Sequence, residues 1–199
     1  MADSPTGADR SAAQEEIMEA TYRALCDHGY ADLTMQAIAA EYGKTTAAIH
    51  YHYETKEDLV VAFLEFILDR FIDHVHGVDT TDPEERLELL LDRLLTDREG
   101  YREFVVAMLE LRAQAPYNDR IREQIQRNDE YVHYLLRTVI ADGVAAGVFA
   151  DVDPEAAARS LMTIVDGART RFASLDERDA LADARRTAAE YVESVLEAE

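Results

Sequence analysis

Residues 34–59 read TMQAIAAEYGKTTAAIHYHYETKEDL, and this stretch decides the fold of the first part of the chain. Thr34 can accept hydrogen bonds from the first amides of a short helix over Met35 to Tyr42. Gly43 follows directly and suits the end of that helix, because glycine adopts the left-handed conformation without strain. The stretch therefore opens with a short helix and a glycine turn.

Thr45 is expected to cap a second, very short helix that runs to about Tyr51. This helix carries more hydrogen-bonding side chains than a structural turn needs, and small residues at Ala47 and Ala48 would let its backbone approach a groove. Thr55, with Asp58 three residues later, then starts a long helix. This order predicts a helix-turn-helix unit whose second short helix enters the DNA major groove.

The rest of the chain has helical periodicity without a convincing period-2 run, so we expect an all-α fold of about nine helices. Ser11 and Gln14 form a capping-box pattern at the start of a helix that reaches Gly29. Proline residues and glycines punctuate the later pattern. The predicted later helices cover residues 83–96, 98–114, 119–146, 154–175 and 177–196.

Charge restricts how the protein could bind DNA. The chain of 199 residues has 41 Asp and Glu against 20 Lys and Arg, a formal charge of -21. Bulk attraction to nucleic acid is therefore excluded, and any DNA contact must be local. Only Lys44 and Lys56 are lysines. A lysine-poor surface rich in carboxylates is typical of proteins that work in molar salt, so a halophilic source is predicted.

Other classes of protein find little support. Cys26 stands alone, which excludes an internal disulfide framework, and no secretory signal or long apolar run is present. We expect a cytoplasmic protein whose residues 1–10 form a disordered tail. No phosphate loop, nucleophile elbow or zinc-protease spacing occurs, so neither an enzyme nor a cofactor is predicted.

Two pairs of histidines, His50 with His52 and His74 with His76, have a spacing that could suggest a metal site. Residues two apart on a helix point about 200° away from each other, so neither pair can chelate one ion unless its segment is extended. No metal site is therefore predicted.

With these features the sequence resembles the TetR family of one-component transcriptional repressors, specifically over Gln14 to Phe63 and more loosely beyond. The matching residues are Ile17, Met18, Ala20, Gly29, Tyr30, Thr34, Ile38, Ala39, Gly43, Thr45, Ala48, Ile49, His52 and Lys56-Glu57-Asp58-Leu59. The resemblance implies a homodimer that binds a palindromic operator in double-stranded DNA and is released by a small-molecule effector. It divides the chain into a DNA-binding domain, residues 11–57, and a ligand-binding and dimerisation domain, residues 58–199.

The resemblance also implies the DNA contacts. The groove-facing candidates are Gln36, Thr46, Ala47, His50 and His52, and the phosphate contacts are Thr34, Thr45, Tyr51 and Lys56. Lys56 has a further rationale, because it begins a helix whose unpaired amides favour a phosphate. The alternatives are a solvated Lys56 and a His52 that packs beside Tyr53.

The last two predicted helices carry apolar stripes that could form half of a four-helix bundle completed by a second copy. The candidate dimer residues are Leu161, Val165, Phe172, Leu181, Ala184, Ala188, Tyr191 and Val195. The alternative is that both stripes face the chain's own core.

Aromatic, methionine and arginine residues on the middle helices are candidates for an effector pocket. They are Phe63, Phe66, Ile67, Met108, Arg112, Tyr131, Tyr134, Met162, Asp166 and Arg169. Such stripes also serve as ordinary core. Arg112 and Arg169 need a partner among apolar helices, either an acidic effector or a neighbouring carboxylate such as Asp166.

A different class of function fits the same residues. An acidic all-α protein-interaction module could use the polar second short helix to bind another protein without any DNA.

Overall fold

The computed structural model describes residues 11–77 and 80–196, and the expected all-α fold is confirmed there. The side chains of His76 and Val195 and the predicted tail, residues 1–10, lie outside the described part. The described residues form nine α-helices, followed by a π-helical turn at Val192–Leu196. The helices are α1 Ala12–Asp32, α2 Met35–Tyr42, α3 Thr46–His50, α4 Lys56–His76, α5 Pro83–Leu95, α6 Tyr101–Gln114, α7 Asp119–Ala146, α8 Pro154–Leu175 and α9 Ala180–Tyr191.

Three helices differ from those predicted by more than one residue at an end. α1 runs past Gly29 to Asp32, although Gly29 itself has φ 70° and ψ 172° and interrupts the helix. α6 begins at Tyr101 because Gly100, at φ 75°, lies outside the helical region. The last predicted helix is shorter, since Asp176 takes a left-handed conformation at the end of α8 and α9 begins only at Ala180.

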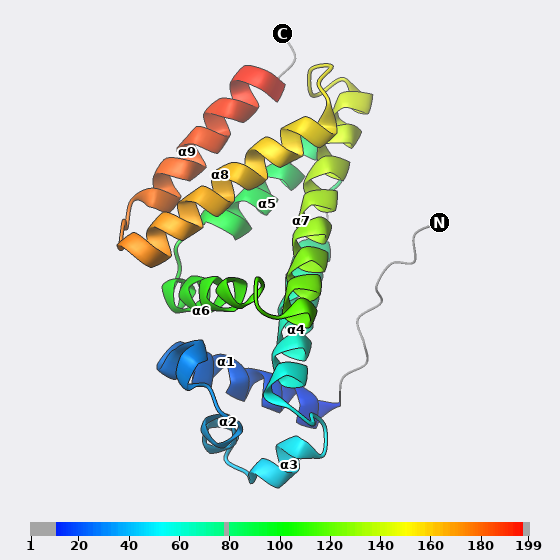
Figure 1. Ribbon diagram of the computed structural model, residues 1–199. Helices are drawn as coiled ribbons and strands as arrows, with labels where there is room; N and C mark the ends of the chain where they lie inside the picture. Colours follow the sequence, from blue (N-terminus) through cyan, green and yellow to red (C-terminus); the bar gives the residue numbers. More distant parts are fainter. Residues whose placement is uncertain (1–10, 78–79, 197–199) are drawn as a thin grey trace. The chain divides into compact units, whose positions relative to one another are not determined.

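The chain divides into two compact units, and the first contains the residues up to Asp73 together with Glu110–Ile125. α1 packs against α2, which contacts α3 (Figure 1). The apolar faces meet in a core that includes the fully buried Ile17, Met18, Ile38 and Ile49. This core holds the short α3, which has too few residues to be stable in isolation.

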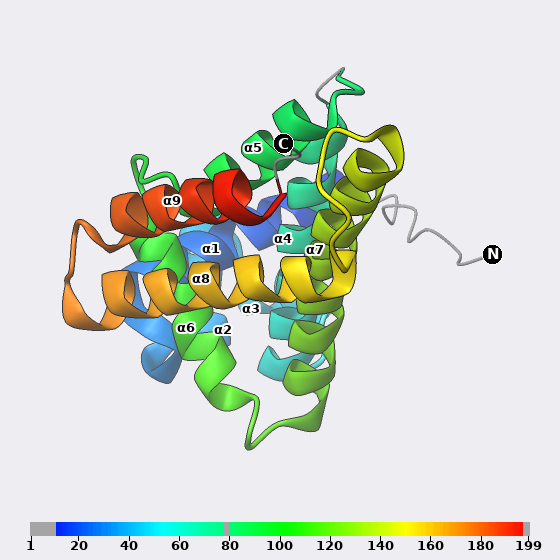
Figure 2. The same cartoon turned by 90° about the horizontal axis from the view of Figure 1, so that it is seen from above.

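The second unit contains His74–Leu109 and the residues from Gln126 onward. α8 and α9 form a helical hairpin whose two helices lie side by side, and α5 contacts both (Figure 1, Figure 2). At the end of α7 the ring of Phe149 lies so close to Gly143 that a Cβ added there would be 2.1 Å from the ring. Among the described helices, none combines the length and apolar character needed to cross a membrane.

Candidate nucleic-acid interface

Local hydrogen bonds build the turn between α2 and α3 as the sequence predicts. The Thr34 hydroxyl accepts a hydrogen bond from the Ala37 amide at 3.0 Å and caps α2. Gly43 ends α2 at φ 70°, a left-handed conformation that glycine adopts most readily. Thr45 precedes α3, but its side chain makes no capping hydrogen bond.

Most of the predicted DNA contacts are exposed. Figure 1 shows α3 at one extremity of the first unit. Tyr51, directly after α3, has 86% of its surface exposed. The exposed candidates are Thr34, Gln36, Thr45, Ala47, His50 and Tyr51, and the half-buried ones are Thr46, His52 and Lys56.

His52 lies between two tyrosines. Its ring meets Tyr51 edge-on at a centroid distance of 5.0 Å and lies 6.3 Å from the ring of the buried Tyr53. The half-buried imidazole therefore contributes to the packing of the segment after α3, as the packing alternative for His52 requires.

The Lys56 side chain turns toward α1. Its Nζ donates a hydrogen bond to the Tyr30 carbonyl at 2.8 Å and lies 4.0 Å from the centre of the Tyr30 ring. Burial lowers the pKa of Lys56. The expected phosphate contact by Lys56 thus stays a prediction, and the ammonium already has partners within the protein.

The other two cations between Gln14 and Asp58 also have partners in the protein. Arg23 binds the side chain of Glu41 at 3.1 Å and its carbonyl at 2.9 Å. Lys44 donates to Glu16 at 2.9 Å and to the Tyr42 hydroxyl at 3.0 Å. The helix-turn-helix therefore has acidic side chains around it and no cation that lacks an internal contact.

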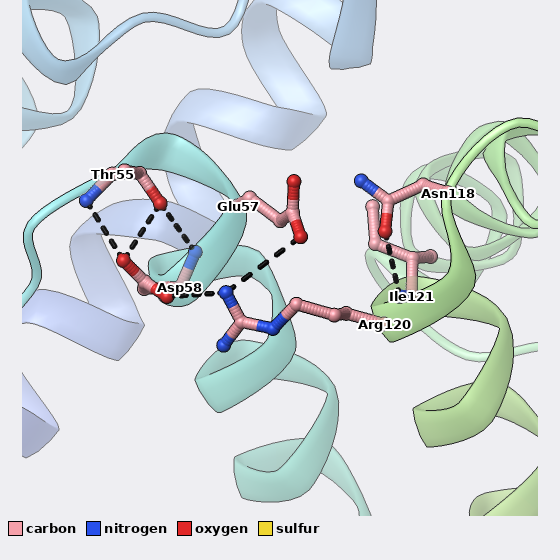
Figure 3. Close-up of polar contacts among 6 residues, drawn as sticks. All are labelled: Thr55, Glu57, Asp58, Asn118, Arg120 and Ile121. Atoms are coloured by element: carbon pink, nitrogen blue, oxygen red, sulfur yellow. Dashed lines mark hydrogen bonds and ion pairs between the residues drawn. The ribbon is translucent and has the colours of Figure 1, made fainter.

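A capping box starts α4, as expected from the spacing of Thr55 and Asp58. The Asp58 carboxylate accepts hydrogen bonds from the amide and hydroxyl of Thr55 at 3.0 Å and 2.7 Å, and the Asp58 amide donates back to the hydroxyl (Figure 3). Arg120, in the first turn of α7, binds the same carboxylate at 2.5 Å and lies 3.6 Å from Glu57. The Thr55 hydroxyl and then Arg120 lower the pKa of Asp58.

Two residues at this unit escaped the sequence reasoning. Glu110, on α6, accepts a hydrogen bond from the Tyr30 amide at 2.5 Å, and its carboxylate lies against Gly29. Arg120 is held at the start of α7, where the Asn118 side chain caps the Ile121 amide at 3.0 Å (Figure 3). Glu110 and Arg120 are 80 and 62 residues from their partners, so no local pattern could reveal them.

The second unit has a cavity of about 350 Å³ at the last turn of α4, between α5 and α7. It is lined by His74, Val75, Thr80, Thr81, Arg86, Leu89, Leu90, Arg93, Leu135 and Val139. None of the ten residues predicted for the effector pocket lines this cavity. These ten residues are distributed over both units. The effector pocket that they are expected to line stays a prediction.

Arg169 has an internal partner that the sequence did not suggest. Its Nε donates to the Leu94 carbonyl at 3.2 Å and lies 3.1 Å from the Tyr101 hydroxyl. The Tyr101 hydroxyl itself donates to the same carbonyl at 2.6 Å. Both groups therefore satisfy a carbonyl in the last turn of α5, where no amide of the same helix is available.

Most of the residues predicted for the dimer interface are buried within the single chain. Leu161, Val165 and Phe172 on α8, and Leu181, Ala184 and Ala188 on α9, are each at most 8% exposed in the single chain. They pack in the core of their own unit, as the alternative held, and a contact between two chains through them stays a prediction. Tyr191 is half-buried, and the Val195 side chain lies outside the described residues.

No group of three or more His, Cys, Asp or Glu side chains in the described residues is placed to hold a metal ion.

The chain is similar to regulators of one family. Residues 17–63 match the family described as "Bacterial regulatory proteins, tetR family", and residues 83–197 match "BetI-type transcriptional repressor, C-terminal". A TetR transcription regulator from Haloarcula marismortui has 56% sequence identity and a TM-score of 0.88, over 93% of this chain and 98% of that one.

Two further proteins are more distant. The HTH-type transcriptional regulator PksA of Bacillus subtilis is 26% identical over 105 residues, and the chain spans about half the length of that relative, 51% of each sequence. A transcriptional regulator from Saccharomonospora viridis in complex with choline has 24% identity and a TM-score of 0.82, over 96% of this chain and 100% of that one. At that identity the likeness concerns the fold alone.

Proposed function

Since the chain belongs to the TetR family of DNA-binding transcriptional regulators, we propose that it is a cytoplasmic repressor that binds a palindromic operator as a homodimer. A small molecule that binds the second unit releases it from DNA. The observation that carries this proposal is the exposure of Ala47, His50 and Tyr51 on a segment that the buried Ile49 and Tyr53 hold in place.

The chemistry of this segment suits a groove. Ala47 is small and exposed, so the backbone of α3 can come close to DNA, and His50 beside it can reach base edges. Thr45, whose hydroxyl makes no capping bond, and the exposed Tyr51 can donate to phosphates. Hydrogen bonds, rather than long cationic side chains, therefore supply the DNA contacts.

A homodimer fits the outer face of α8, opposite the buried stripe. Ala156, Thr163, Gly167 and Thr170 are exposed at helical spacing, and a Cβ on Gly167 would meet nothing within 4 Å. The Thr163 hydroxyl donates to the Arg159 carbonyl at 2.8 Å, so burying this face leaves that hydroxyl satisfied. Small side chains permit close approach of a second copy of α8.

Dimer formation is tested at Gly167. In Gly167→Glu, the new carboxylate would lie across the two-fold axis from the same carboxylate, or from an adjacent turn, of the second copy. Repulsion and burial of charge should then give a monomer by light scattering in high salt. Ala188→Glu is not a clean test, because Ala188 is 0% exposed in the single chain and the change would disrupt the unit itself. A dimer mass for a folded Gly167→Glu variant would place the interface elsewhere.

Release is explained by a shift in population between two arrangements of α4. This helix begins at Lys56, shortly after α3, and its last turn lines the cavity with His74 and Val75. An effector that binds one arrangement of α4 better than the other lowers DNA affinity by its differential binding energy.

DNA binding is tested with a matched pair of tyrosines. Tyr51 and Tyr117 are 86% and 87% exposed, so replacing either by alanine should leave the fold unchanged. Duplexes selected from a random library by the wild-type protein should contain inverted half-sites about one helical turn apart. Tyr51→Ala should weaken binding to them by about 1–3 kcal/mol over two protomers, and Tyr117→Ala should not.

The same experiment distinguishes the repressor from the alternative function. Failure to enrich any duplex, together with unchanged behaviour of both variants, would favour the acidic protein-interaction module. Selection of sequences without dyad symmetry would refute the palindromic operator while leaving DNA binding in place.

A further inference from the structure

The cavity at the end of α4 has an unusual charge for so acidic a chain. Asp and Glu make up 41 of the 199 residues, about one in five. The ten residues that line the cavity include Arg86 and Arg93 but no carboxylate. Two guanidinium groups in the lining of so acidic a chain favour a ligand of negative charge.

Charged groups of both signs lie around the cavity. Burial, followed by the charges of Arg93 and Arg98, lowers the pKa of His74, which lines the cavity beside Arg93. Two carboxylates contact lining residues from outside the cavity. Asp142 pairs with Arg86 at 2.8 Å, and Glu85 accepts a hydrogen bond from Thr80 at 2.5 Å.

The floor of the cavity is apolar. Leu90, Leu135 and Val139 contribute to the lining and are at most 9% exposed, whereas Leu89 lies closer to solvent at 38% exposure. A volume of about 350 Å³ is at the lower end of the range for small-molecule sites. Cations beside an apolar floor are suited to a short molecule with one acidic end.

We propose that this cavity binds a small organic anion, with its acidic group at Arg86 and Arg93 and its short apolar chain on Leu90, Leu135 and Val139. Guanidinium groups suit both carboxylate and phosphoryl oxygens. A quaternary ammonium ion such as choline is held by Trp, Tyr or Phe faces or by carboxylates, and the described lining residues include none of these side chains. The effect of such a ligand on DNA affinity, through His74 and Val75 on α4, rests on the proposed function. The binding of the anion itself does not.

The ligand class is tested by calorimetry with four hexyl probes at constant KCl. Hexanoate and hexylphosphonate should bind, and hexanol should bind at least about tenfold more weakly than either anion. Hexyltrimethylammonium should not bind. Comparison of the two anions distinguishes a carboxylate from a phosphoryl group. The proposal is overturned if the ammonium probe binds as tightly as the anions or if no probe binds.

Variants locate the binding to the cavity. Leu89→Glu adds a negative charge at the partly exposed rim and should weaken hexanoate binding about tenfold, whereas the uncharged Leu89→Gln should weaken it less. Arg93→Gln should weaken it about tenfold or more, and Arg178→Gln, at an exposed position between α8 and α9, should not. Wild-type affinity in folded Leu89→Glu and Arg93→Gln would overturn the assignment.

Operator binding by the same preparations separates this inference from the proposed function. If the protein binds its duplex but none of the probes, the anion site is wrong and the repressor stands. If hexanoate binds with the expected variant pattern but no duplex is bound, the anion site stands and the repressor is wrong.

Discussion

Raising the salt concentration should weaken the DNA affinity of this protein far less than it weakens that of a basic repressor. Between Gln14 and Asp58 the chain has nine carboxylates and three cations, Arg23, Lys44 and Lys56. Each of these cations contacts a carbonyl, a carboxylate or a tyrosine of the same unit. Few are therefore available to neutralise phosphates and release counterions.

The magnitude follows from the number of neutralised phosphates. Each one contributes about −0.9 to the slope of log affinity against log salt concentration. If at most one cation per protomer reaches a phosphate, the slope for a dimer lies between 0 and about −1.8, a loss of no more than about 60-fold over a tenfold rise in salt. A basic repressor with about six phosphate contacts loses about 10⁵-fold over the same range.

Screening of the carboxylates acts in the opposite direction, because salt weakens their repulsion of DNA. Binding is therefore expected to survive, or to become tighter, between about 0.1 M and about 1 M KCl. Cations held between carboxylates and phosphates would strengthen this effect.

The assay is fluorescence anisotropy on a selected duplex, with circular dichroism recorded in the same buffers. The second measurement is needed because an acidic chain can unfold in low salt through repulsion between its own charges. A folded protein whose affinity drops about a thousandfold over this range would refute the reasoning, because that loss requires several phosphate contacts by cations.

Three further predictions concern single side chains. His50→Ala should change which operator variants bind best, by about 1–3 kcal/mol, whereas Lys56→Ala should weaken binding to all sequences alike. If both variants lose affinity equally for every duplex in fluorescence anisotropy, His50 does not contact the groove. Gly143→Ala should lower the free energy of unfolding by about 1–3 kcal/mol in urea melts, because the new methyl group would overlap the Phe149 ring. The loss should be smaller in a Phe149→Leu background. Equal losses in both backgrounds would exclude this contact as the cause. The lowered pKa of Asp58 means that its contribution to stability is present above its unfolded-state pKa and is lost as the pH falls through the folded value. Asp58→Asn should therefore be less stable than wild type at neutral pH and nearly equal to it in acid, and a difference independent of pH would contradict this.

The sequence by itself determined the elements that local hydrogen bonds specify. Thr34 and Gly43 bound α2, and the reciprocal bonds of Thr55 and Asp58 start α4, because each interaction joins residues within a few positions of one another. The same local signals were enough to predict an all-α chain with a helix-turn-helix. They failed by a few residues where a left-handed conformation, as at Asp176, shifted a boundary.

Only the tertiary structure decided what covers each face. Helical spacing revealed the stripe containing Leu161, but it could not tell whether that stripe faces the chain's own core or a second copy, because either burial satisfies the same pattern. Likewise, Lys56 contacts a carbonyl 26 residues away and Arg120 a carboxylate 62 residues away. The cavity at the end of α4 is built from separate segments that packing alone brings together, so no spacing in the sequence could have indicated it.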